Sequence, residues 1–198
     1  MSDEVKRCKW LEHHQKPNDV YIKYHDEEWG VPVHDDRLLF EYLVIEGAQA
    51  GLSWSTILNK RNNYKSAYDN FDPEIVSKYD EHKQLELLQD SGIVRNKLKI
   101  LSSITNARAF IDIQNEFGSF DKYIWSFTNH QTIHNTNRNP SYMPITTIES
   151  DNMSKELKRR GFKFVGSTIC YSFMQAIGMV NDHDLDCFRY NEIKNTGN

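Results

Sequence analysis

Hydrophobic residues recur three and four positions apart along most of this chain, which is the spacing of one helix face. The clearest example follows Asp35 and Asp36, which offer an N-cap, and ends at Gly51, which offers a stop. The sequence therefore predicts a helix over about 36–50 with one face directed inward. The residues that share this face are Leu38, Leu39, Tyr42, Leu43, Glu46 and Ala50.

The same reasoning predicts several further helices. Ser53 is a second N-cap, and Asp72-Pro73 begins a short helix with proline in its first turn. Helices are also predicted over 154–160 and 168–178, with a short link between them. The longest predicted helix spans about 95–113, and its expected buried residues are Leu98, Leu101, Ile104, Ala107 and Ile111.

The remaining segments contain no convincing strand. Gly118-Ser119 opens an aromatic-rich segment, and residues 129–150 are rich in Asn, Thr, Pro and Ser, which indicates an extended connection. We find no clear run of apolar and polar residues that alternates with a period of two. The sequence therefore predicts an all-α fold.

Length and cysteine content bound the class of protein. A chain of 198 residues is long enough for one domain, or for two small lobes around a shared cleft. Three cysteines, Cys8, Cys170 and Cys187, are too few for a disulfide framework, so we expect a reducing compartment, the cytoplasm. We also see no apolar run of membrane-spanning length and no apolar signal-peptide core.

The charge distribution is uneven. A net charge of −4 by itself argues against nucleic-acid binding, because duplex binders generally carry a basic face. Residues 155–163, however, carry five positive charges and one negative charge. Such a run is usually the solvated face of a helix, and it can also bind phosphates, so both interpretations stay open at this point.

Two cysteines and two histidines near the chain ends are candidate metal ligands. His183 and Cys187 are four residues apart, which places both side chains on the same face of a helix. With Cys8 and His25 they could form a tetrahedral zinc site that is structural, because four protein ligands leave no position for a reacting water. The interval between Cys8 and His25 is too long for a standard finger pattern, so the spacing also allows four unrelated residues.

Glu46 is the first candidate for chemistry, because it shares the inward face of the predicted helix. A buried carboxylate needs a partner, which is a ligand in one interpretation and a lysine or arginine of the fold in the other. Aromatic residues nearby could line a pocket for a flat ligand or simply fill the core. They are Trp10, Tyr21, Tyr24, Trp29 and Trp54.

The link between the last two predicted helices is a candidate for binding DNA. Gly161 and Gly166 bracket it, and glycine would allow backbone NH groups to approach a phosphate at the start of the following helix. A basic segment precedes this link. A helix, a glycine-bounded turn and a second helix form a unit that grips a DNA backbone, although two glycines at this spacing are weak evidence alone.

Five stretches of the chain form long motifs. They are 7–10 (Arg-Cys-Lys-Trp), 24–32 (Tyr-His-Asp-Glu-Glu-Trp-Gly-Val-Pro), 46–54 (Glu-Gly-Ala-Gln-Ala-Gly-Leu-Ser-Trp), 161–166 (Gly-Phe-Lys-Phe-Val-Gly) and 180–183 (Val-Asn-Asp-His). These stretches closely resemble, almost residue for residue, the 3-methyladenine DNA glycosylase I family of constitutive bacterial enzymes, and the resemblance extends from about Cys8 to Cys187.

The resemblance implies an α-helical glycosylase of the helix-hairpin-helix superfamily. It implies a single unit over 1–198, possibly with two helical lobes around one base-binding cleft. A structural zinc clip would join the terminal segments 1–34 and 179–198, outside a helical core over 35–178. The implied zinc ligands are Cys8, His25, His183 and Cys187.

The resemblance also assigns roles in the base pocket. By similarity, Glu46 hydrogen-bonds the damaged base, Tyr24 helps to read it and Trp54 stacks on it. Tyr21 and Trp10 match positions that line the pocket.

Contacts to DNA are implied at two places. The turn that contains Gly51 and Leu52 corresponds to the part that approaches the gap left in the duplex. The hairpin with Gly161, Lys163 and Gly166 would hold the DNA backbone.

One departure from the family qualifies this assignment, and one contrast concerns only the wider superfamily. The chain is longer than is typical for the family between Cys8 and His25, and the extra segment contains His13 and His14, which could compete as zinc ligands. We prefer His25 because it lies in the matching Tyr-His-Asp motif. Asn181 stands where the wider superfamily usually has a catalytic aspartate, and its presence agrees with this family.

The implied activity is base-excision repair. After base flipping, the enzyme would hydrolyse the N-glycosidic bond of 3-methyladenine in double-stranded alkylated DNA, acting as a monomer. Methylation at N3 makes the base a cation and a good leaving group, so strong acid catalysis is unnecessary. The alternative is a non-catalytic, zinc-stapled protein that binds alkylated DNA.

Overall fold

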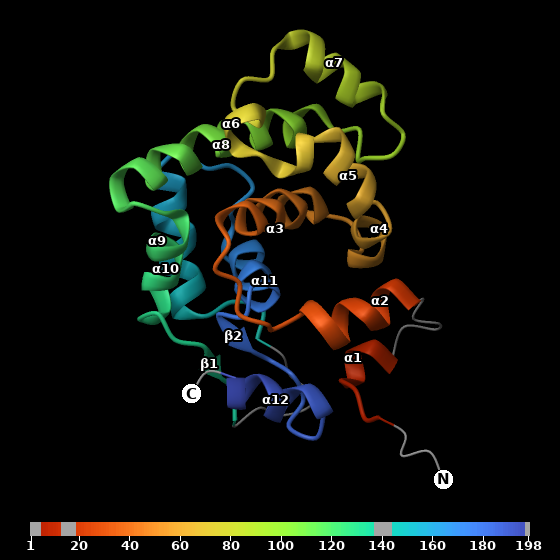
Figure 1. Cartoon of the computed structure of the whole chain (residues 1–198), viewed down its shortest axis with the longest axis vertical. Coiled ribbons are helices and arrows are strands. Elements are labelled where there is room, and N and C mark those ends of the chain that lie inside the picture. Colours follow the sequence, from red (N-terminus) through yellow and green to blue (C-terminus); the bar gives the residue numbers. More distant parts are fainter. Residues whose placement is uncertain (1–4, 13–18, 137–143, 197–198) are drawn as a thin grey trace.

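The computed structural model describes residues 5–12, 19–136 and 144–196, and these residues are mostly helical. Figure 1 shows the long helices packed around α3, with both chain ends at the lower part of the molecule. The first elements are α1 (Lys9–Glu12), α2 (Asp19–Lys23), the π-helix η1 (Tyr24–Glu28), α3 (Asp36–Gln49), α4 (Trp54–Leu58), α5 (Arg61–Ala67), the 3-10 helix η2 (Asp69–Phe71), α6 (Pro73–Val76) and α7 (Glu81–Gln89).

The second half of the chain continues the helical pattern. Its elements are α8 (Lys97–Phe117), α9 (Phe120–Trp125), the 3-10 helix η3 (Ser126–Thr128), β1 (Ile133–His134), α10 (Ile148–Arg159), α11 (Ser167–Ala176), β2 (Val180–Asn181) and α12 (Phe188–Thr196). The strands β1 and β2 form a parallel pair of two residues each, with Ile133 opposite Val180. The predicted all-α fold is therefore confirmed apart from this short pair.

Local capping signals set several of the predicted helix starts. The Asp35 side chain accepts a hydrogen bond from the Leu38 N–H at the start of α3, and the Ser53 hydroxyl accepts one from the Thr56 N–H at the start of α4. Asp72 caps α6 in the same way. Each cap satisfies N–H groups that have no partner inside the helix, which explains why the sequence predicted these boundaries well.

Helix α3 differs from its prediction because it is buried on all sides. Every residue from Leu39 to Ala48 is buried, including Glu41 as well as Glu46. Phe40 contacts Phe110 of α8 with ring centroids 5.2 Å apart, and α11 packs on another side of α3. A helix surrounded by others has no solvent face, so the one-sided pattern that we expected is wrong.

The buried face of α8 was only partly predicted. Ile104 and Ala107 are buried as expected, but Leu98 is 67% exposed, and Leu101 and Ile111 are half-buried. The stripe that packs against the core is rotated from the predicted one. It consists of Ile100, Ser103, Ile104, Ala107, Phe110 and Ile113.

The start of α10 also differs from the prediction. The helix begins at Ile148, six residues before the predicted start at Ser154, because Thr147 and Ser150 form a reciprocal capping box. The predicted extended connection over 129–150 is thus shorter, and it contains β1. Helices α10 and α11 pack together around the link over 161–167, as expected for a helical hairpin.

The two terminal segments lie side by side. The Phe188 N–H at the start of α12 donates to the Lys6 carbonyl at 3.0 Å, and the Lys9 N–H donates to the Asp184 carboxylate at 2.7 Å. In Figure 1, α1 and α12 occupy the same end of the molecule. Within the described ranges, no helix combines the length and apolarity needed to cross a bilayer.

Candidate functional site

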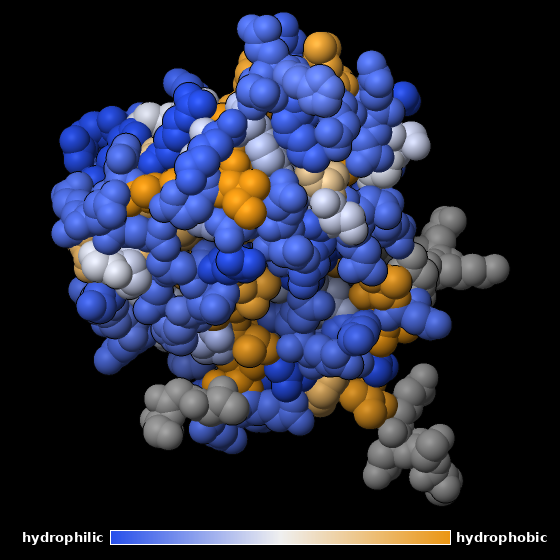
Figure 2. All heavy atoms as spheres, turned by 45° about the horizontal axis from the view of Figure 1, so that its top comes forward, coloured by the Kyte–Doolittle hydropathy of each residue, from blue (hydrophilic) through white to orange (hydrophobic). Residues whose placement is uncertain are grey.

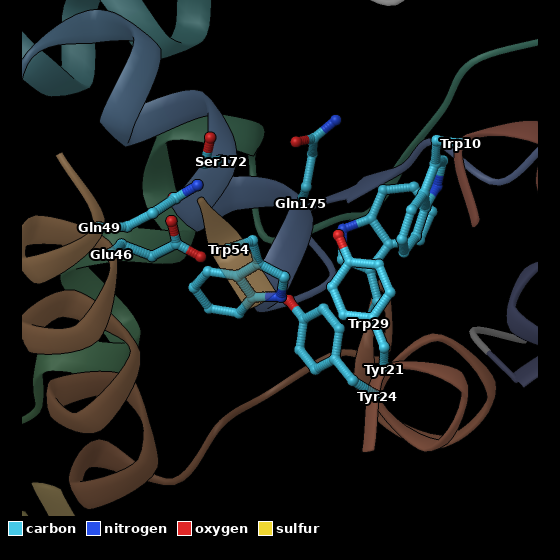
Figure 3. A pocket seen from close by; sticks show the side chains of 9 residues that line it. All are labelled: Trp10, Tyr21, Tyr24, Trp29, Glu46, Gln49, Trp54, Ser172 and Gln175. Atoms are coloured by element: carbon cyan, nitrogen blue, oxygen red, sulfur yellow. The ribbon is translucent and has the colours of Figure 1, made fainter. Parts of the chain in front are cut away.

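A cavity of about 200 Å³ lies where α3, α4 and α11 meet the N-terminal segment. Figure 3 shows Glu46 and Gln49 on one side and the rings of Trp10, Tyr21 and Trp29 on the other. Trp54 and Tyr24 lie between them in this view. The cavity therefore has one polar wall and one aromatic wall. Its lining residues are Trp10, Tyr21, Tyr24, Trp29, Glu46, Gln49, Trp54, Ser172 and Gln175.

Glu46 is buried in this cavity without a cationic partner in the described structure. Its Oε2 atom has no hydrogen-bond partner, and burial raises the pKa of its carboxyl to about 8. Glu41, on the same helix, is buried too, but the Arg61 guanidinium donates to it at 2.5 Å. Because Glu41 has the arginine partner that we considered for Glu46, the open partner position at Glu46 points to a ligand.

The aromatic wall consists of rings at steep angles to one another. Trp10 contacts Tyr21 and Trp29 edge-on, with centroids 5.5 and 5.1 Å apart. Trp54 and Tyr24 are 5.2 Å apart with a tilt of 52°. The Nε1 atoms of Trp10 and Trp54 are buried without partners. Such a wall offers flat faces for stacking and N–H donors for an acceptor on a ligand.

Burial also controls the ionisation of Tyr24. Desolvation raises the pKa of its hydroxyl well above the ordinary value, and the nearby Tyr42 hydroxyl and Glu46 carboxyl raise it further. Tyr24 therefore stays neutral and can donate a hydrogen bond from its O–H at any physiological pH.

Three polar residues of the cavity were missed from the sequence. Gln49 lies one helical turn after Glu46, and Ser172 and Gln175 lie three residues apart on α11. The Gln175 side-chain NH₂ donates to the buried Asp182 at 2.7 Å, which fixes the orientation of the amide. The i, i+3 polar pair Ser172 and Gln175 on the apolar second half of α11 was the available signal.

The four candidate metal ligands meet in one buried cluster. The ligand atoms of Cys8, His25, His183 and Cys187 all lie within 4.8 Å of one another. Cys8 Sγ is 3.3 Å from His183 Nδ1, and Cys187 Sγ is 3.6 Å from both His183 Nδ1 and His25 Nε2. Neighbouring sulfur and nitrogen ligands of a tetrahedral zinc are about 3.6 Å apart, so the donor set and its spacing fit this ion.

Outer contacts orient the two imidazoles. The second nitrogen of His183 lies 2.9 Å from the Trp29 carbonyl, and the second nitrogen of His25 lies 2.7 Å from Asp26. Arg7 in turn holds Asp26 through both carboxylate oxygens. These contacts place protons on the outer nitrogens, His183 Nε2 and His25 Nδ1. The inner nitrogens, which face the two cysteines, are left as acceptors, and this is the arrangement of metal-ligating histidines.

Each cysteine of the cluster affects the ionisation of the other. The hydrogen bond from Cys8 lowers the pKa of Cys187, with further help from His183 and His25. The same bond, together with burial, raises the pKa of Cys8. A metal cation would favour the thiolate form of both, since thiolates are the ligating form.

A π-helical turn connects the cavity to the cluster. In η1 the Trp29 N–H donates to the Tyr24 carbonyl five residues earlier, at 2.9 Å. Within this turn Tyr24 lines the cavity and its neighbour His25 joins the metal cluster. Trp29 lines the cavity, and its ring centroid is 4.6 Å from that of His183. The two sites therefore share a wall, and π-turns often occur at such functional positions.

The turn after α3 lies at the rim of the cavity. Gly51 has a φ of +77°, and nothing lies within 4 Å of the position that a Cβ would occupy. Leu52 is 41% exposed. The turn can therefore reach a partner outside the molecule.

The link between α10 and α11 packs against α3 beside the cavity. Gly161 has a φ of +93°, and the positions of added Cβ atoms at Gly161 and Gly166 are open. The side chain of Asn106 in α8 makes two hydrogen bonds to the backbone of Lys163. Its oxygen accepts from the Lys163 N–H at 2.8 Å, and its NH₂ donates to the Lys163 carbonyl at 3.0 Å. The side chain of Lys163 is exposed. The hairpin is thus rigid and has space for a close approach of another backbone.

The basic segment over 155–163 is partly neutralised. Arg159 and Arg160 are paired with Glu156, and Arg160 also binds Glu116. Lys155 and Lys158 remain exposed. On the face shown in Figure 2, hydrophilic residues predominate and hydrophobic ones form small separate groups.

Asn181 lines neither the cavity nor the cluster. Asn181 is buried and structural, because its amide donates to the Tyr190 carbonyl at 3.1 Å and its oxygen accepts from the His183 N–H. His13 and His14, the possible competing ligands, lie outside the described residues.

Comparisons with known proteins show which family the chain resembles. The family model of methyladenine glycosylase matches residues 13–190. DNA-3-methyladenine glycosylase 1 of Escherichia coli (strain K12) is 48% identical over 186 residues, which are 94% of this chain and 97% of that protein.

Solved structures give the same result. A crystal structure of 3-methyladenine DNA glycosylase I is similar with a TM-score of 0.87 and 48% identity, over 92% of this chain and 98% of that one. A single-residue variant of a 3-methyladenine DNA glycosylase I, solved in complex with 3-methyladenine, has a TM-score of 0.84 and 33% identity. That similarity covers 87% of this chain and 93% of the other.

Proposed function

This chain belongs to the methyladenine glycosylase family, and from that premise we propose that it excises 3-methyladenine from alkylated double-stranded DNA. The reaction is hydrolysis of the N-glycosidic bond after the damaged nucleotide has left the base stack. Water attacks the sugar as positive charge moves onto it from the departing base.

The unpartnered Glu46 carboxyl in a ring-lined cavity carries this proposal. N3-methylation gives adenine a positive charge in DNA, and the Glu46 carboxylate is the anionic partner that such a base needs. Tyr24 would read the base by a hydrogen bond, and Trp54 would stack on its face. Tyr21 and Trp10 would close the aromatic wall.

The raised pKa of Glu46 adds a feature to this mechanism. With a pKa of about 8, the carboxyl is mostly protonated at neutral pH while the cavity holds no base. A cationic base favours the ionised form, so its entry would release the proton and create the ion pair. A neutral adenine could not drive that release, which contributes to selectivity for the methylated base.

The rim and the hairpin would hold the DNA. We propose that Gly51 and Leu52 approach the gap left by the extruded nucleotide, while Gly161, Lys163 and Gly166 bind the backbone as a helix-hairpin-helix unit. Their open backbone positions and the rigid support of the hairpin favour these roles.

The metal cluster would have a structural role. Zinc held by Cys8, His25, His183 and Cys187 would supply only cross-linking, because four protein ligands leave no open position. Free thiols at these positions suit a reducing compartment, and we place the protein in the cytoplasm as a monomer. We also propose one glycosylase unit over the whole chain.

The decisive experiment measures release of free 3-methyladenine from methylated duplex DNA, with 7-methylguanine as the control base. Selective release of 3-methyladenine is the expected result. Tight binding to the same DNA without release would instead favour a non-catalytic binder of alkylated DNA.

A further inference from the structure

A lysine from another helix closes the end of α3. The Lys99 ammonium of α8 donates hydrogen bonds to the Ala48 and Ala50 carbonyls, at 2.7 Å each. The last turn of α3 has no basic residue of its own. Carbonyls at a helix C-terminus lack partners inside the helix and carry partial negative charge, so a cation there satisfies and stabilises them.

Lys99 is itself held firmly. Asn96 caps α8 and accepts a hydrogen bond from the Lys99 N–H at 3.2 Å, in the first turn of this 21-residue helix. Partial burial lowers the pKa of the Lys99 ammonium. The lysine is therefore positioned by a rigid element rather than by a flexible loop.

The backbone that Lys99 binds, from Ala48 to Ala50, connects the pocket to the rim turn at Gly51 and Leu52. Gln49, whose side chain lines the cavity, lies between the two carbonyls that Lys99 binds. Gly51 and Leu52 follow directly, and the chain then returns to the pocket at Trp54. Lys99 does not line the cavity, so its effect on the base would be indirect.

We propose that Lys99 is a positioning residue that holds the Gly51–Leu52 turn in the conformation that fills the gap in the duplex. This inference rests on the proposed glycosylase function. The brace fixes the direction in which the backbone leaves α3, and so the direction of the exposed Leu52 side chain. Without the brace, the turn would adopt several conformations, and a displacement of about 1 Å is enough to cost a large part of a catalytic rate.

The test compares Lys99→Met with Lys99→Arg and Lys97→Met. Lys97 is an exposed lysine two residues earlier in the same helical turn, so its substitution removes an equal charge near the same place. Arginine at position 99 keeps the charge and the donors. Thermal melting of each variant first establishes that it is folded.

Two measurements distinguish the effect of a substitution on the Gly51–Leu52 turn from its effect on the pocket. The first uses duplex DNA with a stable abasic analogue opposite 2-aminopurine, whose fluorescence rises when the rim enters the stack. The second measures the affinity for free 3-methyladenine by quenching of tryptophan fluorescence. Excision from methylated duplex is measured alongside both.

For Lys99→Met we expect excision to fall at least about tenfold and the 2-aminopurine signal to be largely lost. Free-base affinity should stay within about twofold, and Lys99→Arg should recover most of both losses. A wild-type 2-aminopurine signal in Lys99→Met, or an equal loss in Lys97→Met, would overturn the proposal. Failure of the wild-type protein to release 3-methyladenine would instead overturn the proposed function.

Discussion

The base pocket and the metal cluster lie side by side and both bury ionisable groups, but they satisfy them differently. In the cluster, the four candidate ligands contact one another, and the outer nitrogens of His25 and His183 are bound to Asp26 and the Trp29 carbonyl. In the pocket, Glu46 Oε2 and two indole N–H groups have no partner in the described structure.

Unpaired buried polar atoms cost stability. Under the proposed function, a ligand completes those of the pocket, whereas the cluster holds the fold together through a cation. Sites of the two kinds should therefore respond to substitution in different measurements.

The largest effect is expected at the cluster. Cys187→Ser should remove bound zinc and lower the free energy of unfolding by roughly 3 kcal/mol or more, because the terminal segments lose their cross-link. Metal analysis and thermal melting of the same samples measure both changes.

Cys170→Ser is the matched control for this variant. Cys170 is buried but lies outside the cluster, and burial raises its pKa to about 12. Its substitution should leave the metal content unchanged. A metal-free Cys187→Ser protein with wild-type stability would show that the cluster does not hold the fold.

The next effect concerns activity at the pocket. Glu46→Gln should fold normally and lose at least about tenfold in excision of 3-methyladenine, since a charge-assisted hydrogen bond contributes roughly 1.5–3 kcal/mol. Single-turnover excision measures this loss. Glu81→Gln, at an exposed position on α7, serves as the control for removal of one negative charge.

Glu46→Gln, which should lower activity, should raise the stability of the folded protein. Because the pKa of Glu46 is about 8 in the folded protein and 4.5 ordinarily, the folded state binds the proton more tightly. The wild-type protein therefore loses stability as the pH rises from 4.5 to 8.

Glu46→Gln cannot lose this proton, so its advantage in melting temperature should grow over that pH range. Melting curves at pH 5 and pH 8 measure the difference. A gap between the two proteins that does not change with pH would refute the raised pKa.

The smallest effect is expected at Trp10, which lies between the pocket and the metal cluster. The ring of Trp10 lies in the pocket and also contacts His25, with centroids 5.4 Å apart. Trp10→Phe should weaken binding of free 3-methyladenine about threefold through loss of stacking area, and leave the zinc content unchanged. Loss of metal in this variant would mean that the two sites cannot be separated.

Local chemistry made part of this molecule predictable. The caps at Asp35, Ser53 and Asp72 fixed helix starts correctly because each depends only on residues within one turn. The four candidate metal ligands were chosen partly from the spacing of His183 and Cys187, and they do meet in one cluster. The predicted helix at these two residues is wrong, because both lie between β2 and α12. Glu46 was found because it interrupts an apolar face.

Tertiary packing decided the rest. The burial of α3 on every side and the rotation of the buried stripe on α8 depend on which helices surround them, so periodicity alone gave the wrong faces. Gln175 lines the pocket because α11 packs against α3, which its own sequence neighbourhood does not reveal. Lys99 reaches α3 across 49 residues of sequence, a distance over which no spacing rule applies.

The π-turn at Tyr24–Glu28 has a consequence for insertions and deletions. It presents Tyr24 to one site and His25 to the other across a single peptide bond. Each residue added or removed within it would turn the following backbone by about 100° and take Trp29 out of the shared wall. Changes in chain length are therefore expected to accumulate outside the five residues of this turn.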